Sequence, residues 1–289
     1  MRTQAPDPLA DPDVPKGMSL ELLKELHLLT REGKLNADAR RKLKQIRHLV
    51  GLLRPVLDDA FTARESPVVV DCGAGKSYLG FLLYELLLGP AGRGTLHSVE
   101  SRAELSAAAA ARAHRFGHER FRFVAGTIAA GELPGEVHLV TALHACDTAT
   151  DEALVLGIAR GADAIAVVPC CQAEVARQLG ERNDREPVDQ ALIEHPLHRR
   201  ELGSHLTNVV RALCLEACGY KVTVTELVGW EHSLKNELLL ARRVFRPERG
   251  TRTTLARLLD RWHIEPTLVR ALRAAGLDPT VSADSPDRR

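Results

Sequence analysis

The stretch that decides the fold is Val68–Tyr78, which reads VVVDCGAGKSY. A run of β-branched residues leads to Asp71, two glycines follow at Gly73 and Gly75, and a helix-forming stretch continues to Leu88. A buried parallel strand favours such a Val run, and a tight strand-to-helix turn needs glycine where the backbone approaches a ligand. The stretch therefore predicts a nucleotide-cofactor turn.

This turn fits neither of the common phosphate-binding motifs. The phosphate loop of nucleoside triphosphatases has a glycine five residues before its Gly-Lys pair, and that position is Val70 in this chain. The dinucleotide motif G-x-G-x-x-G has a third glycine where this chain has Tyr78. We predict a cofactor without phosphates. Another nucleotide cofactor, or a glycine turn without a ligand, is the alternative.

S-adenosylmethionine carries a cationic amino acid and a sulfonium, so its site favours a carboxylate at the strand end. Asp71 is that carboxylate. A second one is expected at the end of the next strand, where it would hold the ribose hydroxyls, and Thr95–Ser101 supplies Glu100. The predicted cofactor contacts are Asp71, Gly73, Gly75, Glu100, Thr127 and His144.

Composition indicates one substantial core. The chain has 289 residues, 45% of them hydrophobic, which suffices for one domain with short appendages. The Pro- and Asp-rich first 17 residues have no apolar segment, and the apolar run Leu79–Leu88 is short and interrupted by Glu85. We therefore expect no signal peptide, no membrane span and a cytoplasmic location. Six cysteines without a secretory signal are expected to be reduced thiols.

Strands and helices alternate along the chain up to about residue 170, as in a doubly wound parallel sheet. Two further strands, Lys221–Val228 and Glu237–Val244, lie too close together for a crossover and are expected to be antiparallel. The predicted fold is α/β, a class I methyltransferase-like Rossmann fold with a seven-stranded, mostly parallel sheet and an antiparallel terminal hairpin. Before the hairpin, Glu174–His205 predicts an elaborated helix and loop, and Leu206–Cys218 predicts a helix.

The chain is predicted to divide into four parts. Residues 1–17 are a disordered arm, and residues 18–66 a helical, basic N-terminal extension. Residues 67–245 are the S-adenosylmethionine-dependent methyltransferase domain, and residues 246–289 a small helical C-terminal tail.

Charge is unevenly distributed. The net charge of +1 combines +2 over residues 1–66, −6 over residues 67–240 and +5 over residues 241–289. The segment Ala39–Leu57 has no acidic residue, and its apolar residues recur at steps of three and four, which predicts an amphipathic helix with a basic outer face. This face is either simply solvated or a surface that contacts RNA phosphates. The predicted RNA-binding residues are Arg40, Arg41, Lys44 and Arg47.

Catalytic candidates follow from topology, because ligands of open α/β sheets bind beyond the carboxyl ends of the strands. Methyl transfer from a sulfonium needs an in-line nucleophile and an acceptor for its proton. His144 and Asp147 are candidate proton acceptors, and Lys235 could orient an oxygen nucleophile or bind phosphate. A structural histidine and a surface lysine are the alternatives. Cys170 and Cys171 lack the spacing of zinc sites, so no metal is predicted, and whether they are chemical or structural stays open.

Four motifs, DCGAGKSYLGF, ALHACDTATDEAL, VPCCQ and EHSLKNELLLAR, resemble a methyltransferase-domain family. That family includes the eukaryotic tRNA 2′-O-methyltransferase of acceptor-stem position 4 and the methyltransferase-like domain of glutathione S-transferase C-terminal domain-containing protein. The sequence departs from the family at Ser77 and Asp147, where members often have Gly. The resemblance implies that Asp71, Gly73, Gly75 and Glu100 bind the cofactor, and that His144, Asp147, Asp151, Cys170, Cys171, Lys235 and Asn236 line the active-site side.

The sequence therefore predicts an S-adenosylmethionine-dependent methyltransferase acting on RNA, either tRNA or rRNA. Two alternatives stay open: methylation of a small molecule or a protein, and a catalytically degenerate scaffold that binds the cofactor. The oligomeric state is not predicted.

Overall fold

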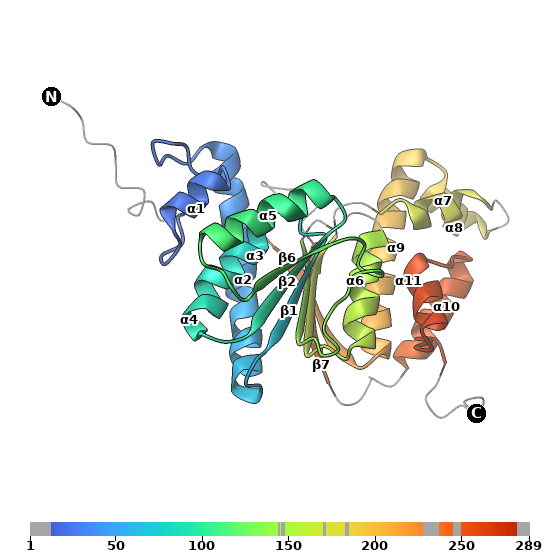
Figure 1. Cartoon of the computed structure of the whole chain (residues 1–289). Helices are drawn as coiled ribbons and strands as arrows, with labels where there is room; N and C mark the ends of the chain where they lie inside the picture. Colours follow the sequence, from blue (N-terminus) through green and yellow to red (C-terminus); the bar gives the residue numbers. More distant parts are fainter. Residues whose placement is uncertain are drawn as a thin grey trace.

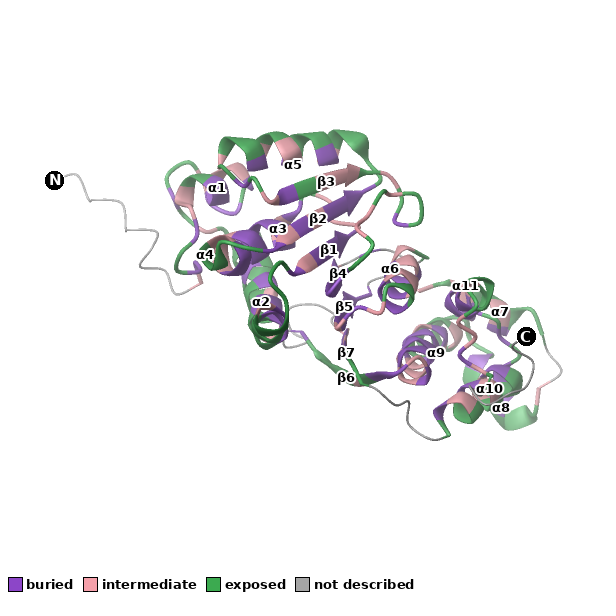
Figure 2. Cartoon of the chain, turned by 60° about the horizontal axis from the view of Figure 1, so that its bottom comes forward, coloured by how far each residue is buried: buried purple, intermediate pink, exposed green. Residues whose placement is uncertain are grey.

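The computed structural model describes residues 13–143, 145, 148–169, 172–182, 185–227, 237–244 and 250–281. Within these ranges one seven-stranded sheet lies between two groups of helices (Figure 1), and its strand order is β3-β2-β1-β4-β5-β7-β6 (Figure 2). The strands are β1 (Val68–Cys72), β2 (Thr95–Glu100), β3 (Phe121–Ala125), β4 (Leu139–Leu143), β5 (Ala164–Val168), β6 (Tyr220–Glu226) and β7 (Glu237–Arg243).

The strand directions confirm the predicted fold class. Strand β1 is parallel to β2 and β4, β3 is parallel to β2, and β5 is parallel to β4. Strand β7 is antiparallel to both β5 and β6. Two antiparallel steps restore the direction, so the carboxyl end of β6 lies at the same edge of the sheet as the carboxyl ends of β1, β4 and β5. The amino end of β7 lies at this edge as well.

Helices cover both faces of the sheet, one group to each side in Figures 1 and 2. On one face, the apolar residues of the first group pack with Val69 and Leu139. On the other face, the second group packs with Val70 and Val140. This alternation follows the two-residue period of a strand. The first group is α1 (Leu20–Glu25), α2 (Ala37–Ala63), α3 (Tyr78–Leu83) and α5 (Ala103–Arg115); the second is α6 (Thr148–Ala159), α7 (Glu174–Gly180), α8 (Pro187–Ile193), α9 (Pro196–Ala217), α10 (Thr251–Trp262) and α11 (Thr267–Ala274).

Helix α2 confirms the predicted amphipathic helix. Its apolar residues are buried on the side of the helix that faces the sheet, and its cationic residues are exposed. The buried residues include all six of the predicted period: Ala39, Leu43, Ile46, Val50, Leu53 and Leu57. No helix in the described ranges is long and apolar enough to cross a membrane.

Two helices differ from their predicted extent. The stretch predicted as one helix over Tyr78–Leu88 consists of α3 and a π-helical turn, η2 (Tyr84–Leu88), followed by the short α4 (Gly89–Ala91). Helix α9 begins at Pro196 rather than at Leu206. Its first ten residues are polar and His-rich, so they lack the apolar period from which the helix was predicted, although proline suits the first turn of a helix.

A third glycine of the β1–α3 turn lies two residues beyond Tyr78. A Cβ atom added to Gly80 would lie 2.6 Å from Cζ of Phe121 on β3 and 3.2 Å from Cδ2 of Leu96 on β2. Gly80 therefore permits the close approach of helix and sheet that the dinucleotide motif assigns to its last glycine.

Candidate functional site

The turn after β1 has left-handed backbone at alternate residues. The φ angles are +63° at Gly73, +57° at Gly75 and +58° at Ser77. Glycine adopts this conformation at little cost, whereas serine does not. The Ser77 side chain is buried and its hydroxyl lies 2.7 Å from the hydroxyl of Ser98 on β2. Hence Ser77 keeps the conformation suited to glycine and gains a buried hydrogen bond.

Asp71 lies at the carboxyl end of β1, directly before this turn. It is 2% exposed, and its Oδ1 atom accepts a hydrogen bond of 2.8 Å from the Thr141 hydroxyl on β4. Burial raises the pKa of Asp71 to about 7, although the Thr141 hydrogen bond acts in the opposite direction. Near neutral pH the Asp71 carboxyl group is therefore partly protonated and partly ionised. A nearby cation would favour its ionised form.

Asp71 opens onto a cavity of about 270 Å³ at the carboxyl ends of β1 and β4. One wall is the glycine turn with the first turn of α3, and the opposite wall is the amino-terminal half of α2. The lining residues are Lys42, Gln45, Ile46, Asp71, Ala74, Tyr78, Leu79 and Leu143.

Glu100 ends β2 and braces the same turn from the other side. Its Oε2 atom accepts a hydrogen bond of 2.6 Å from the Gly75 amide, and Oε1 accepts from the amide and Nε of Arg102 at 3.0 and 2.9 Å. Burial acts to raise the pKa of Glu100, but the donors of Arg102 and Gly75 hold it below its ordinary value. Glu100 is therefore the ionised acid of the pair.

Thr127 follows β3 at the same edge of the sheet. The preceding residue, Gly126, donates its amide to the Glu100 carbonyl at 3.0 Å. The exposed Thr127 hydroxyl accepts from the Ala130 amide at 3.3 Å. The structure thus places Thr127 beside the end of β2, where its side chain closes a local turn. Its predicted cofactor contact stays a prediction.

The candidate catalytic residues His144, Asp147 and Lys235 lie outside the described residues, as do Cys170, Cys171 and Asn236. Ala145, which follows β4, is described: a Cβ atom added to Gly73 would lie 3.2 Å from the Ala145 Cβ. Hence Ala145 lies directly against the glycine turn.

The four predicted RNA-binding residues, Arg40, Arg41, Lys44 and Arg47, are all exposed on α2. Arg40 forms an ion pair with Asp13. Lys44 and Arg47 line a groove of about 570 Å³ between α2 and the end of β6. The other lining residues are His48, Gly51, Leu52, Glu226 and Leu227.

This groove lies at the carboxyl edge of the sheet, because Glu226 is the last residue of β6. The cavity beside Asp71 lies at the same edge, and α2 contributes to both, through Lys42 and Gln45 to the cavity and through its next turns to the groove. The sequence indicated a basic helix. The sequence did not predict that the amino-terminal half of this helix lines the site, because a local sequence pattern does not indicate which strand ends a helix covers.

Comparisons with known proteins find similarity to methyltransferases. Residues 41–178 match a protein-family model described as a methyltransferase domain. Among solved structures, an rRNA methylase from Streptococcus thermophilus has a TM-score of 0.38 and 11% identity, over 62% of this chain and 87% of that one. The magnesium protoporphyrin IX methyltransferase from Synechocystis PCC 6803, with bound S-adenosylmethionine, has a TM-score of 0.43 and 12% identity, over 80% and 100%. No curated protein matches the chain.

The family match, the sheet order and the acidic glycine turn identify the class of this protein as an S-adenosylmethionine-dependent methyltransferase. The residues present fit this cofactor: the buried Asp71, with a pKa of about 7, lines the cavity, Glu100 accepts from the Gly75 amide, and Gly73 and Gly75 give the turn its left-handed backbone. S-adenosylmethionine supplies an electrophilic methyl group on its sulfonium when bound.

Proposed function

We propose that this methyltransferase modifies RNA, either tRNA or rRNA, and that residues 67–245 form its catalytic domain, with the basic extension of residues 18–66 contributing to substrate binding. The observation that carries the proposal is the groove lined by Lys44, Arg47 and His48. It lies at the same edge of the sheet as Asp71, so a phosphodiester backbone bound there would pass near the methyl donor. Cationic side chains on a groove wall are the usual contacts of nucleic-acid phosphates.

In this proposal the cofactor lies between Asp71 and Glu100, over Gly73 and Gly75, with further contacts from Thr127 and His144. His144 and Asp147 accept the proton of the attacking hydroxyl or amine, and Lys235 orients an oxygen nucleophile.

RNA binding is tested by the salt dependence of affinity. The fluorescence anisotropy of labelled tRNA should show an affinity that falls steeply with ionic strength, with a slope proportional to the phosphates contacted. Lys44→Ala and Arg47→Ala should each weaken binding and lower that slope by about 1. Arg54→Ala is the matched control, because Arg54 is exposed on the same helix and does not line the groove. A flat salt response, or an equal loss in the control, would contradict the proposal.

Methyl transfer itself is tested with radiolabelled S-adenosylmethionine and RNA from a strain lacking the gene, followed by nucleoside mass spectrometry. Incorporation into one nucleoside identifies the target and the methylated atom. Cofactor binding without transfer to RNA or to lysate would favour the degenerate scaffold instead.

A small-molecule or protein substrate is a second candidate, favoured by the apolar part of the cavity beside Asp71, where Ile46, Leu79 and Leu143 face the opening. It predicts methyl transfer that is insensitive to Lys44→Ala and Arg47→Ala. The two substrate classes are thus separated by the same pair of variants.

A further inference from the structure

Helix α9 has a polar stripe where it faces the core. Ser204, Asn208 and Arg211 are spaced by four and three residues, so they lie on one face of the helix. Asn208 is 5% exposed and Arg211 is 1% exposed. Buried polar groups lower stability unless they are paired, and apolar side chains of similar volume often stabilise more. A polar stripe at this position therefore calls for a reason other than stability.

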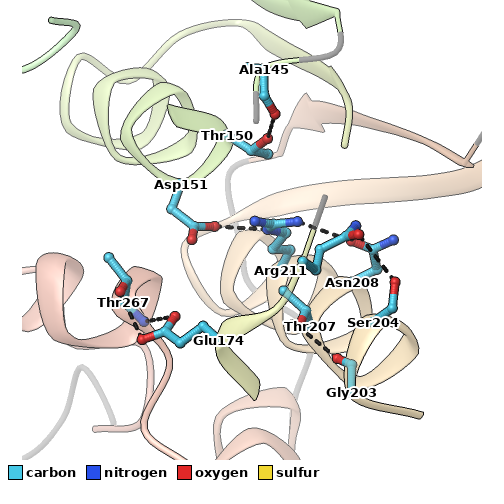
Figure 3. Close-up of polar contacts among 11 residues, drawn as sticks. Ala145, Thr150, Asp151, Glu174, Gly203, Ser204, Thr207, Asn208, Arg211 and Thr267 are labelled. Carbon is cyan, nitrogen blue, oxygen red and sulfur yellow. Dashed lines mark hydrogen bonds and ion pairs between the residues drawn. The ribbon is translucent and has the colours of Figure 1, made fainter. Parts of the chain in front are cut away.

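Asn208 is the centre of the stripe (Figure 3). Its Oδ1 atom accepts from Nε2 of Gln172 at 2.9 Å and from Nη1 of Arg211 at 3.2 Å. Its Nδ2 atom donates to Oε2 of Glu237 at 2.8 Å. The Ser204 hydroxyl donates to Oε1 of Gln172 at 3.1 Å, so both ends of the Gln172 amide are bonded to α9.

Arg211 extends these contacts to the start of α6. Its Nε atom donates to Oδ1 of Asp151 at 2.8 Å, and both side chains are buried. The neighbouring Thr150 hydroxyl donates to the carbonyl of Ala145 at 2.6 Å. Ala145 lies against Gly73. A continuous series of contacts therefore leads from the glycine turn, through α6 and α9, to Gln172 and Glu237.

The three segments held by this stripe all reach the carboxyl edge of the sheet. Asp151 follows β4, Gln172 follows β5, and Glu237 is the first residue of β7. Gln172 comes directly after Cys171 in the chain, and Glu237 directly after Asn236. The stripe thus holds Asp151, Gln172 and Glu237 on the side of the glycine turn that faces away from Glu100 and β3.

We propose that Asn208 and Arg211 are positioning residues for the methyl acceptor: they hold Asp151, Gln172 and Glu237, at the carboxyl edge of the sheet, in register with the glycine turn. This inference rests on the proposed methyltransferase site. Neither residue takes part in the reaction. A displacement of about 1 Å at a reacting group can lower a rate about 100-fold, and three hydrogen bonds at the buried Asn208 amide are a means of preventing it.

The test compares Asn208→Ala with Thr207→Val by hydrogen–deuterium exchange. Thr207 is the matched control, because it is buried on the same helix and its hydroxyl donates within α9, to the Gly203 carbonyl at 2.7 Å. Asn208→Ala should increase exchange in peptides covering residues 148–155, 172–178 and 237–243, and Thr207→Val should not. Gln172→Ala removes only the contacts of Gln172 with α9, so it should increase exchange only in the peptide that contains residue 172. This variant keeps the test decisive if Asn208→Ala folds poorly.

The functional readout separates donor from acceptor. Calorimetry should show that Asn208→Ala binds S-adenosylmethionine within about threefold of the wild type, while kcat for RNA methylation falls about 10- to 100-fold. Arg211→Lys keeps the charge and loses the planar guanidinium group. Its kcat should therefore lie between those of the wild type and Asn208→Ala.

Unchanged exchange in all three peptides, or a loss of cofactor affinity in step with kcat, would overturn the positioning role. If the wild type transfers no methyl group to RNA and the exchange pattern is as expected, the positioning role stands and RNA is the wrong substrate.

Discussion

Two buried carboxylates at the glycine turn differ in their protonation. Asp71 has a pKa raised by burial to about 7, whereas the pKa of Glu100 lies below its ordinary value because Arg102 and the Gly75 amide donate to it. If the cofactor binds beside Asp71 as proposed, its cationic amino group and sulfonium favour the ionised acid, so we expect Asp71 to lose its proton on binding.

We therefore predict that S-adenosylmethionine affinity weakens as the pH falls. Below the pKa of Asp71, the ionised fraction decreases about tenfold per pH unit, so the Kd should rise about 10- to 30-fold between pH 8 and pH 5.5. Asp71→Asn should bind weakly at every pH and lose this dependence, as measured by titration calorimetry. Glu100 does not titrate in this range. An unchanged pH profile in Asp71→Asn would assign the dependence to another group.

Ser77 combines a left-handed backbone with a buried hydrogen bond to Ser98. Ser77→Ala loses the hydrogen bond and keeps the strained backbone, so it should destabilise the protein by about 1–2 kcal/mol. Ser77→Gly loses the same bond but relieves the strain, so it should be about 1 kcal/mol more stable than Ser77→Ala. Urea unfolding of the two variants measures the difference. Equal stability would mean that the backbone at Ser77 stores no strain.

Helix α3 depends on one glycine for its distance from the sheet. A methyl group at Gly80 would lie 2.6 Å from the Phe121 ring, in a buried aromatic cluster that also contains Phe81. Gly80→Ala should therefore cost about 1–3 kcal/mol through overpacking. Gly51, inside α2, has no atom within 4 Å of an added Cβ, and Gly51→Ala should stabilise by up to about 1 kcal/mol. Chemical denaturation should give the two changes opposite signs.

Helix α2 connects the site to the rest of the molecule. Its amino-terminal half lines the cavity and the groove, and near its other end Asp59 pairs with Arg242 of β7 at 3.0 Å. The helix therefore spans the sheet from one edge to the other. Its basic outer face and its site-lining turns belong to one rigid element.

At the scale of the whole molecule, the described residues form two apolar clusters, one on each face of the sheet. Helices α10 and α11 contribute Leu255, Trp262 and Leu268 to the second cluster, with α6 and α9. Glu174 on α7 accepts hydrogen bonds from the amide and hydroxyl of Thr267 at 2.8 and 2.9 Å, which fixes the start of α11.

A chain truncated before Thr251 should consequently expose the apolar faces of α6 and α9. We expect it to bind a hydrophobic dye and to aggregate, as measured by dye fluorescence and sedimentation. The control is full-length Arg257→Ala, which changes an exposed residue of α10 and should leave both measurements unaltered. A monomeric truncated chain without dye binding would show that the second cluster is complete without these helices.

Several features of the site could be predicted from local sequence. The Val run before Asp71, the glycines after it and Glu100 at the next strand end all occur where the structure has the β1 turn and the end of β2. Strand alternation, glycine at positive φ and the apolar period of α2 depend on neighbouring residues only, so they leave a readable pattern.

Sequence alone therefore established the α/β class, the glycine turn after β1, the acids at the ends of β1 and β2, and the basic helix, because each is set by the chemistry of adjacent residues. Folding in three dimensions determined that α2 covers the end of β1, that Gly80 supplies the close approach next to Tyr78, and that Asn208 joins Gln172 to Glu237. These contacts join residues far apart in the chain. They depend on how the helices pack against the sheet, and this packing produces no periodic pattern in the sequence.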